Sequence, residues 1–322
     1  MDNQQGSVSA IIAVYNPDSN FFDKAVSSVL GQTYPVRELV LVNDGGSEHF
    51  RSQLPDDPRI RVFTKRNEGV AAARNFAIDK CTGEYIAFLD QDDFWYPDKL
   101  LQQFSLISHI GEQCMVTSSV TIVDAAGDKI QKYSKYSQKL YRLKADNEMA
   151  LLNLIYENFI FSSTPLIHNA VFKKIGGFDP LTQPHDDWDM YIRIMIAGFS
   201  VYFYKLEPLS VWRSHCANGS NNPDVMLSSK CRVEKKLLGN ATDDGIRRIA
   251  EINLLIDYME RDNLFYKRGH YARFRVLIKY HMFQLLRERQ LMSRKFYRRV
   301  YKLCIKSGRR YLVSYVLEYV KK

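Results

Sequence analysis

The stretch Val8–Val14, VSAIIAV, decides the fold class that we expect for this chain of 322 residues. It is a continuous apolar run that stops at Asn16-Pro17, which is typical of a strand buried in a parallel sheet. A helix is predicted to follow, because Asp18 or Ser19 can cap its start and Gly31 ends its apolar pattern.

The pattern of a strand followed by a helix recurs along the first 110 residues. Further strands are expected at Glu38–Val42 (ELVLV), Ile60–Thr64 and Tyr85–Leu89 (YIAFL), and further helices at Asn67–Lys80 and Asp98–Ile110. Alternation of this kind predicts an α/β fold with an open, mostly parallel sheet.

The rest of the chain is mixed at first and then helical. Strands are expected at Met115–Val123, Lys129–Tyr133 and Val201–Tyr204, and helices at Asn147–Tyr156 and Asp186–Ala197. After Pro223 the pattern is helical to the end. We therefore expect one α/β domain over residues 1–222 and a helical, basic C-terminal region over residues 223–322.

Composition excludes several classes of protein. The chain has no apolar run of 18 residues, which a membrane-spanning helix needs, and its polar N-terminus does not resemble a signal peptide. Five scattered cysteines without a CxxC pair indicate neither a disulfide framework nor a zinc site. We expect a cytoplasmic protein.

The positive net charge of +9 is concentrated in the last part of the chain. Residues 265–322 contain 17 Lys or Arg against Glu288 and Glu318. Their apolar residues recur at helical spacing, so two interpretations stay open. The segment either lies on an anionic membrane surface, or it packs on the α/β domain with its charges solvated.

Acidic residues follow two of the expected strands. Asp44 comes after the second strand, and Asp90, Asp92 and Asp93 come after the fourth. The carboxyl ends of parallel strands form the ligand crevice of such sheets, so both groups are expected at one site. Crowded carboxylates suit Mg²⁺ or Mn²⁺ bound together with phosphates. The alternative is a solvated acidic turn in which these residues cap a helix.

Five segments resemble, in order and spacing, the GT-A fold glycosyltransferases of family 2. They are SAIIAVYNPD (9–18), QTYPVRELVLVNDGGS (32–47), RNEGVAAARNFAI (66–78), GEYIAFLDQDDFW (83–95) and IGGFDPLTQPHDDWDMYIRIMIAGF (175–199). The likeness covers roughly residues 7–220. It implies a GT-A, Rossmann-like domain with a C-terminal helical extension, and an inverting enzyme that uses a nucleotide-sugar.

The resemblance implies a donor site. Asp44 matches the aspartate that binds the nucleotide base, commonly uracil. Asp90 and Asp92 match the ends of the DxD motif, where Asp92 is expected to hold the metal directly and Asp90 to hold the ribose, the metal or its water. Further members are Asn67, Gly69 and Arg74, on the nucleotide side; Arg74 instead forming a structural ion pair stays open.

The resemblance also implies a catalytic base and a third metal ligand. Asp187 matches the general base that removes the proton of the acceptor hydroxyl. Because Asp186 stands where relatives usually have Glu, either of these two residues remains a candidate. Both, with Asp189, also suit the first turn of a helix. His215 matches a histidine that completes the metal shell or contacts the diphosphate.

The function implied is transfer of a sugar, with a UDP-sugar favoured, to a saccharide or polyprenyl diphosphate-linked acceptor in surface polysaccharide synthesis. Peripheral contact with the inner face of the cell membrane is also expected. Two rivals are a non-catalytic saccharide-binding relative and a basic nucleic-acid-binding protein. No nucleic-acid motif is present, and we expect no nucleic-acid partner.

Overall fold

The computed structural model describes residues 6–110, 114–130, 147–204 and 207–267. The chain divides into two compact units, Met1–Asn218 and Gly219–Lys322, and each is described by itself.

A seven-stranded sheet forms the centre of the first unit. Its order is β3-β2-β1-β4-β8-β6-β9, with β1 (Val8–Val14), β2 (Glu38–Asp44), β3 (Ile60–Lys65), β4 (Tyr85–Phe88), β6 (Cys114–Ser118), β8 (Leu166–His168) and β9 (Ser200–Tyr204). Only β8 runs antiparallel to its neighbours in this sheet, β4 and β6. The expected α/β fold with a mostly parallel sheet is confirmed.

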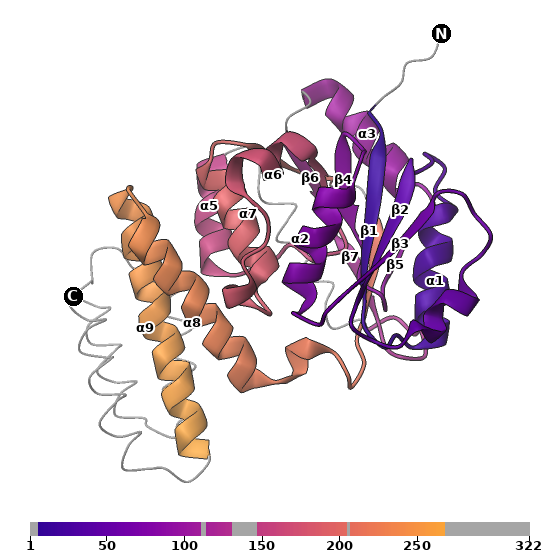
Figure 1. Cartoon of the computed structure of the whole chain (residues 1–322). Coiled ribbons are helices and arrows are strands. Elements are labelled where there is room, and N and C mark those ends of the chain that lie inside the picture. Colours follow the sequence, from indigo (N-terminus) through magenta and orange to yellow (C-terminus); the bar gives the residue numbers. More distant parts are fainter. Residues whose placement is uncertain (1–5, 111–113, 131–146, 205–206, 268–322) are drawn as a thin grey trace, which may run out of the picture. The chain divides into compact units, whose positions relative to one another are not determined.

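Helices cover both faces of the sheet (Figure 1). On one face, α1 (Ser19–Leu30) and α3 (Lys99–Ile110) pack on alternate residues of β1, including Ala10 and Ile12. On the other face lies α2 (Val70–Lys80), which contacts β1 and β2. The apolar run of β1 is buried because helices cover both of its faces.

The chain after the sheet's first half supplies the remaining elements of the first unit. They are α5 (Asn147–Tyr156), α6 (Asn169–Ile175), α7 (Asp186–Ile196) and the short 3-10 helices η1 (Glu48–Gln53) and η3 (Pro180–Thr182). Asp18 caps α1 as expected, since its Oδ1 accepts from the amides of Asn20 and Phe21. The helix expected from Asn67 begins later, at Val70, because Gly69 is its N-cap.

One expected strand was wrong in an informative way. Met115–Val123 is two strands in different sheets, divided at Ser119: β6 joins the large sheet, and β7 (Val120–Val123) joins a small one of order β5-β10-β7. The other members of the small sheet are β5 (Phe94–Trp95) and β10 (Ser210–Arg213). Lys129 forms an isolated bridge with Val123, and most of the strand expected at 129–133 lies outside the described residues.

The second unit is helical where it is described. It contains η4 (Gly219–Asn221), α8 (Pro223–Asn240) and α9 (Asp244–Lys267). Lys230 Nζ on α8 lies 2.7 Å from Asp257 Oδ1 on α9, an ion pair that links the two helices. The basic segment 268–322 lies outside the described residues.

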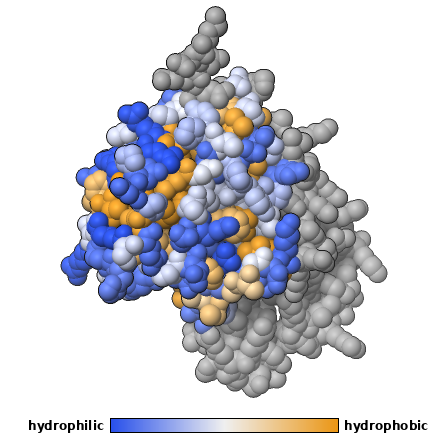
Figure 2. All heavy atoms as spheres, turned by 90° about the vertical axis from the view of Figure 1, so that its right-hand side faces the viewer, coloured by the Kyte–Doolittle hydropathy of each residue, from blue (hydrophilic) through white to orange (hydrophobic). Residues whose placement is uncertain are grey.

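The described surface is mixed in character. Hydrophobic side chains appear in separate patches among hydrophilic ones on the face drawn in Figure 2. Within the part of the chain that the structure describes, no helix has the length and apolarity that a bilayer span requires.

Candidate active site

The candidate site lies at the carboxyl ends of β1, β2 and β4, which are neighbours in the sheet. Parallel strands deliver the residues that follow them to one edge. Asp44 is the last residue of β2, and Asp90 and Asp92 follow β4 by two and four positions.

Asp44 is buried and closes one corner of the site. Its carboxylate accepts hydrogen bonds from the amide of Glu68 (3.1 Å), the amide of Gly69 (2.8 Å) and Lys65 Nζ (3.0 Å). Gly69 has a φ of +91°, a backbone region that disfavours other residues. Asn67 lies against the preceding loop, because a Cβ on Gly45 would meet its amide nitrogen at 2.7 Å. Asp44, Asn67 and Gly69 are therefore brought together.

Arg74 joins two acidic segments that are far apart in the chain. Its buried guanidinium contacts Asp90 Oδ1 at 2.5 Å and Asp186 Oδ2 at 3.2 Å. Burial alone lowers the pKa of Arg74, but the two carboxylates raise it above its usual value. Asp90 also accepts a hydrogen bond from Ser162 Oγ at 2.6 Å. Arg74 thus forms an ion pair, which was one of its two possible roles, and this ion pair lies at the candidate site.

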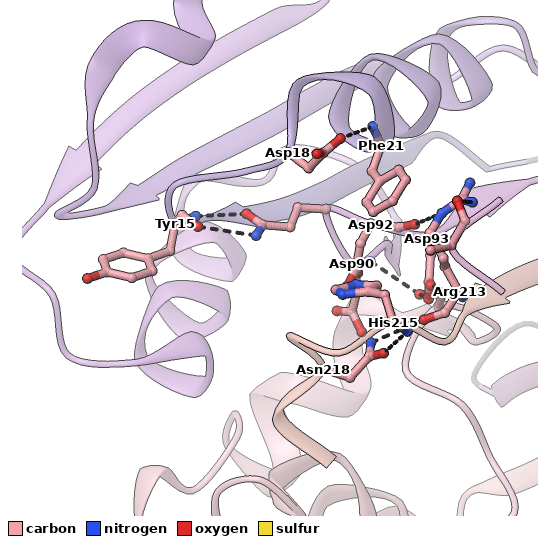
Figure 3. A network of polar contacts seen from close by, with 12 residues as sticks. Tyr15, Asp18, Phe21, Asp90, Asp92, Asp93, Arg213, His215 and Asn218 are labelled. Carbon is pink, nitrogen blue, oxygen red and sulfur yellow. Dashed lines mark hydrogen bonds and ion pairs between the residues drawn. The ribbon is translucent and has the colours of Figure 1, made fainter. Parts of the chain in front are cut away.

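Asp92 faces His215 across the site (Figure 3). Asp92 Oδ2 and His215 Nε2 are 2.7 Å apart, and the imidazole lies beside the ring of Phe21. Burial and the charge of Asp90 raise the pKa of the Asp92 carboxyl, while His215 opposes the shift. Two of the three expected metal ligands are therefore in contact, and the third, Asp90, is turned toward Arg74 and Ser162.

The donor atoms of this group fit a hard divalent cation. A carboxylate oxygen and an imidazole nitrogen suit Mn²⁺, and carboxylates with phosphates suit Mg²⁺. The candidate ligand atoms Asp92 Oδ2 and His215 Nε2 lie 2.7 Å apart. Both oxygens of Asp90 already accept hydrogen bonds, but a carboxylate has about four acceptor positions, so a further contact remains open to it.

Asp93 has a different task from its two acidic neighbours. It is buried, and it accepts hydrogen bonds from Ser163 Oγ (2.6 Å) and from the backbone amide of Arg213 (2.9 Å). Burial and the charges of Asp90 and Asp92 raise its pKa well above the usual value. Arg213 in turn donates from Nε to the carbonyl of Asp92 at 3.1 Å. Asp93 and Arg213 hold the acidic loop in place.

The first turn of α7 distinguishes its three aspartates. Asp186 is buried against Arg74, and Asp189 pairs with Arg193 at 2.8 Å, one helical turn later. Asp187 is half-buried, with Asn158 Nδ2 at 3.4 Å and 3.5 Å from its two oxygens. Burial and the charge of Asp186 raise the pKa of Asp187 to about 7.

Trp188 on α7 and Trp212 on β10 differ in how far their rings are buried. Trp188 is buried and donates from Nε1 to the carbonyl of Leu154 at 2.7 Å, so its ring is not available to a sugar. Trp212 is partly exposed and lies 5.7 Å, between ring centroids, from Phe161.

Five residues of the site were not expected from the sequence. They are Gln91, Asn158, Ser162, Ser163 and Arg213. Each contacts a candidate residue, or the loop beside one, through a side-chain hydrogen bond across 29 to 121 positions of the chain. The polar run Ser162-Ser163-Thr164 before an apolar strand was the one available signal, and it named no partner.

Comparison with known proteins identifies relatives of one kind. Residues 9–168 match the family model described as glycosyl transferase family 2. An uncharacterized glycosyltransferase of Rickettsia typhi is 32% identical over 216 residues, covering 66% of this chain and 66% of that protein. A putative teichuronic acid biosynthesis glycosyltransferase of Bacillus subtilis, TuaG, is 38% identical over 112 residues, covering 33% of this chain and 44% of TuaG.

Solved structures show the same fold at low sequence identity. S. aureus TarS 1–349 in complex with UDP-GlcNAc has a TM-score of 0.63 at 16% identity, covering 98% of this chain and 91% of that chain. The chain spans about two thirds of the Rickettsia typhi relative and 30% of a Rickettsia bellii relative.

Proposed function

Because the chain belongs to glycosyl transferase family 2, we propose that it transfers a sugar from a nucleotide-diphosphate donor to an acceptor hydroxyl with inversion. A UDP-sugar is the favoured donor, and the acceptor is a saccharide or a polyprenyl diphosphate-linked saccharide. The reaction belongs to cell-surface polysaccharide synthesis on the cytoplasmic side of the membrane. The teichuronic acid assignment of TuaG and the UDP-GlcNAc bound to TarS support this direction.

One observation carries the proposal: Arg74 ties Asp90 of the acidic loop to Asp186, the residue next to Asp187. The same arginine thus serves the donor side and the acceptor side. A non-catalytic saccharide-binding protein has no need for a carboxyl with a raised pKa beside the acidic loop. An enzyme uses such groups as acids and bases.

Asp187 is the proposed base. Asp186 forms an ion pair with Arg74, whereas Asp187 is half-buried and has a pKa of about 7. A base with a pKa near the working pH combines a useful fraction of the ionised form with a strong affinity for the proton. Asn158 lies beside both of its oxygens and favours one orientation of the carboxylate.

The proposed step is a single displacement. The acceptor oxygen forms a bond to the anomeric carbon, and its proton passes to Asp187. The bond from the anomeric carbon to the phosphate oxygen breaks on the opposite side, and the nucleoside diphosphate leaves with the electron pair. Asp92 and His215, with Asp90 in support, would hold a divalent ion, which when bound would offset the negative charge that the leaving group gains.

A donor panel tests this function. UDP-, GDP- and dTDP-sugars are incubated with the chain and Mn²⁺ or EDTA, and release of nucleoside diphosphate is measured. We expect turnover of one donor class with Mn²⁺ and none with EDTA. Asp187→Asn should lower kcat by about 100-fold or more, the usual range for loss of a general base, with little change in nucleotide affinity. Equal loss of both would mean that the base is misplaced.

A further inference from the structure

We propose that Gln91, the central residue of Asp90-Gln91-Asp92, is a positioning residue for nucleotide binding. Its side-chain amide fastens the loop after β1 to the acidic loop after β4. The inference rests on the proposed function and adds to the donor site a residue whose identity the DxD motif leaves open and that is not among the expected metal ligands.

The contact joins side chain to backbone in both directions. The amide N–H of Tyr15 donates to Gln91 Oε1 at 2.8 Å, and Gln91 Nε2 donates to the carbonyl of Tyr15 at 3.2 Å. A primary amide offers a donor and an acceptor side by side, as a neighbouring strand does. Gln91 therefore continues the pairing of β1 with β4 beyond its end, where Leu89 donates to the carbonyl of Ile11.

The loop after β1 is held from its other side as well. Asn16 has a φ of 42°, in the left-handed region, and its Oδ1 accepts from the amide of Ser47 at 2.8 Å. Gly46 lies close to it, since a Cβ there would meet the Asn16 nitrogen at 2.9 Å. The Tyr15-Asn16 loop is thus fixed between the segment after β2 and the segment after β4.

This position is what gives Gln91 a part in binding. In the order β2-β1-β4, the loop lies between Asp44 at the end of β2 and Asp92 beyond β4. Tyr15 is 51% exposed, and its ring points away from the acidic network (Figure 3). A ligand that reaches from Asp44 to Asp92 has to pass this loop, so the height of the loop sets the shape of the donor site.

The alternative is a purely structural role for Gln91, and the solvent exposure of its hydrogen bonds argues against that role. Both hydrogen bonds of Gln91 are exposed to solvent, where water replaces a lost partner at small cost to stability. Loss of the contact is therefore expected to release the loop without unfolding the domain.

The test compares Gln91→Ala with a matched control, Gln102→Ala. Gln102 on α3 also makes a side-chain hydrogen bond, accepting from the Tyr204 hydroxyl at 3.1 Å, but it lies outside the site. Affinity for UDP, GDP and dTDP with Mn²⁺ is measured by calorimetry. For the nucleotide that the wild type binds best, Gln91→Ala should raise Kd about 3- to 10-fold, as expected for one or two hydrogen bonds. Gln102→Ala should not change Kd.

Further readouts separate positioning from structure and from metal binding. With Gln91→Ala, the Tm and the affinity for Mn²⁺ alone should stay near the wild-type values. An unchanged Kd, or a loss confined to Tm, kcat or Mn²⁺ affinity, would overturn the inference alone. A wild type that binds none of the three nucleotides would overturn the proposed function, and the inference with it.

Discussion

Asp186 and Asp187 are adjacent in sequence, yet their surroundings separate their roles. Asp186 lies under Arg74, and its charge is compensated there. Asp187 has no such cation in direct contact among the described residues, and burial with the charge of Asp186 raises its pKa to about 7. The doubt that the sequence leaves about the base is a doubt about which side chain faces Arg74, and only the fold decides that.

Asp187→Asn is expected to stabilise the metal-free protein, and more at pH 8 than at pH 5. An unfolded aspartate has a pKa of about 3.9, below the folded value of about 7 for Asp187. The unfolded state therefore loses this proton first, so the wild type loses stability as pH rises between these values, and asparagine does not. Thermal unfolding in EDTA measures the difference. Asp189→Asn, which breaks the pair with Arg193, is the control and should destabilise at both pH values.

Arg74→Ala is expected to destabilise the fold strongly. It leaves the buried Asp186 and the half-buried Asp90 without their shared cation, and loss of one partner of a buried ion pair typically costs about 3–5 kcal/mol. Arg51→Ala removes a surface pair with Glu48, in which the arginine side chain is 44% exposed, and should cost about 0–1 kcal/mol. Urea denaturation compares the two, and equal small losses would contradict the bridging role of Arg74.

For single residues, the sequence predicts the chemical role of a side chain better than it predicts which residue that side chain contacts. Asp44, Asp92 and His215 carry groups whose type indicates their use, and the structure brings Asp92 and His215 together. Gln91 and Asn158 have ordinary amide side chains, and their importance depends on which backbone or carboxylate lies opposite. No local pattern encodes a partner 76 positions away, as Tyr15 is from Gln91.

Elements with long apolar runs or clear caps are the ones that the sequence predicts well. β1, β2 and α1 agree with expectation, because apolar pattern and caps act locally. β8, with three residues, and β5, with two, have too few positions to show a period. The division of 115–123 into β6 and β7 depends on two different sheets being available, which is a tertiary matter.

Gly177 lies against Asn75 of α2, in the segment that precedes α7. Asn75 on α2 accepts from the Phe178 amide at 2.7 Å and donates to the Phe178 carbonyl at 2.8 Å. A Cβ on Gly177 would meet Asn75 Oδ1 at 2.1 Å. Gly177→Ala should therefore break this clamp and cost about 1–3 kcal/mol, the usual range for overpacking.

Gly239→Ala is the matched control for that substitution. Among the described residues nothing lies within 4 Å of a Cβ there, and the position is in α8, where alanine favours the helix. The same denaturation experiment should show Gly239→Ala as neutral or stabilising. If Gly177→Ala were equally harmless, the clamp would not hold the segment that precedes α7.

The fold of the first unit places residues that are far apart in the sequence close together. Parallel strands bring Asp44 and the acidic loop to one edge of the sheet. Arg74 connects this edge to Asp186 of α7, and His215 reaches Asp92 from the segment after β10. Alternating strands and helices predict a parallel sheet whose carboxyl edge carries the ligand site, so the location of the site was foreseeable. The place of β8 and β10 in the two sheets was not, because their sequences are too short to signal it.

The basic charge of residues 265–322 leads to a separate prediction about binding to membranes. If residues 265–322 meet an anionic surface, the full chain should sediment with phosphatidylglycerol vesicles at low salt and be released at high salt. It should not sediment with phosphatidylcholine vesicles. Failure to bind the anionic vesicles would favour the interpretation in which this segment packs on its own protein.

The proposed function requires one cation and one nucleotide to share the site formed by Asp92 and His215. Retention of Mn²⁺ by the protein, followed by the electron spin resonance of free Mn²⁺ with and without UDP, tests it most directly. We predict that UDP increases Mn²⁺ retention by the wild type, and that Asp92→Asn and His215→Ala each abolish the increase. Retention that is the same in the wild type and both variants would contradict the account.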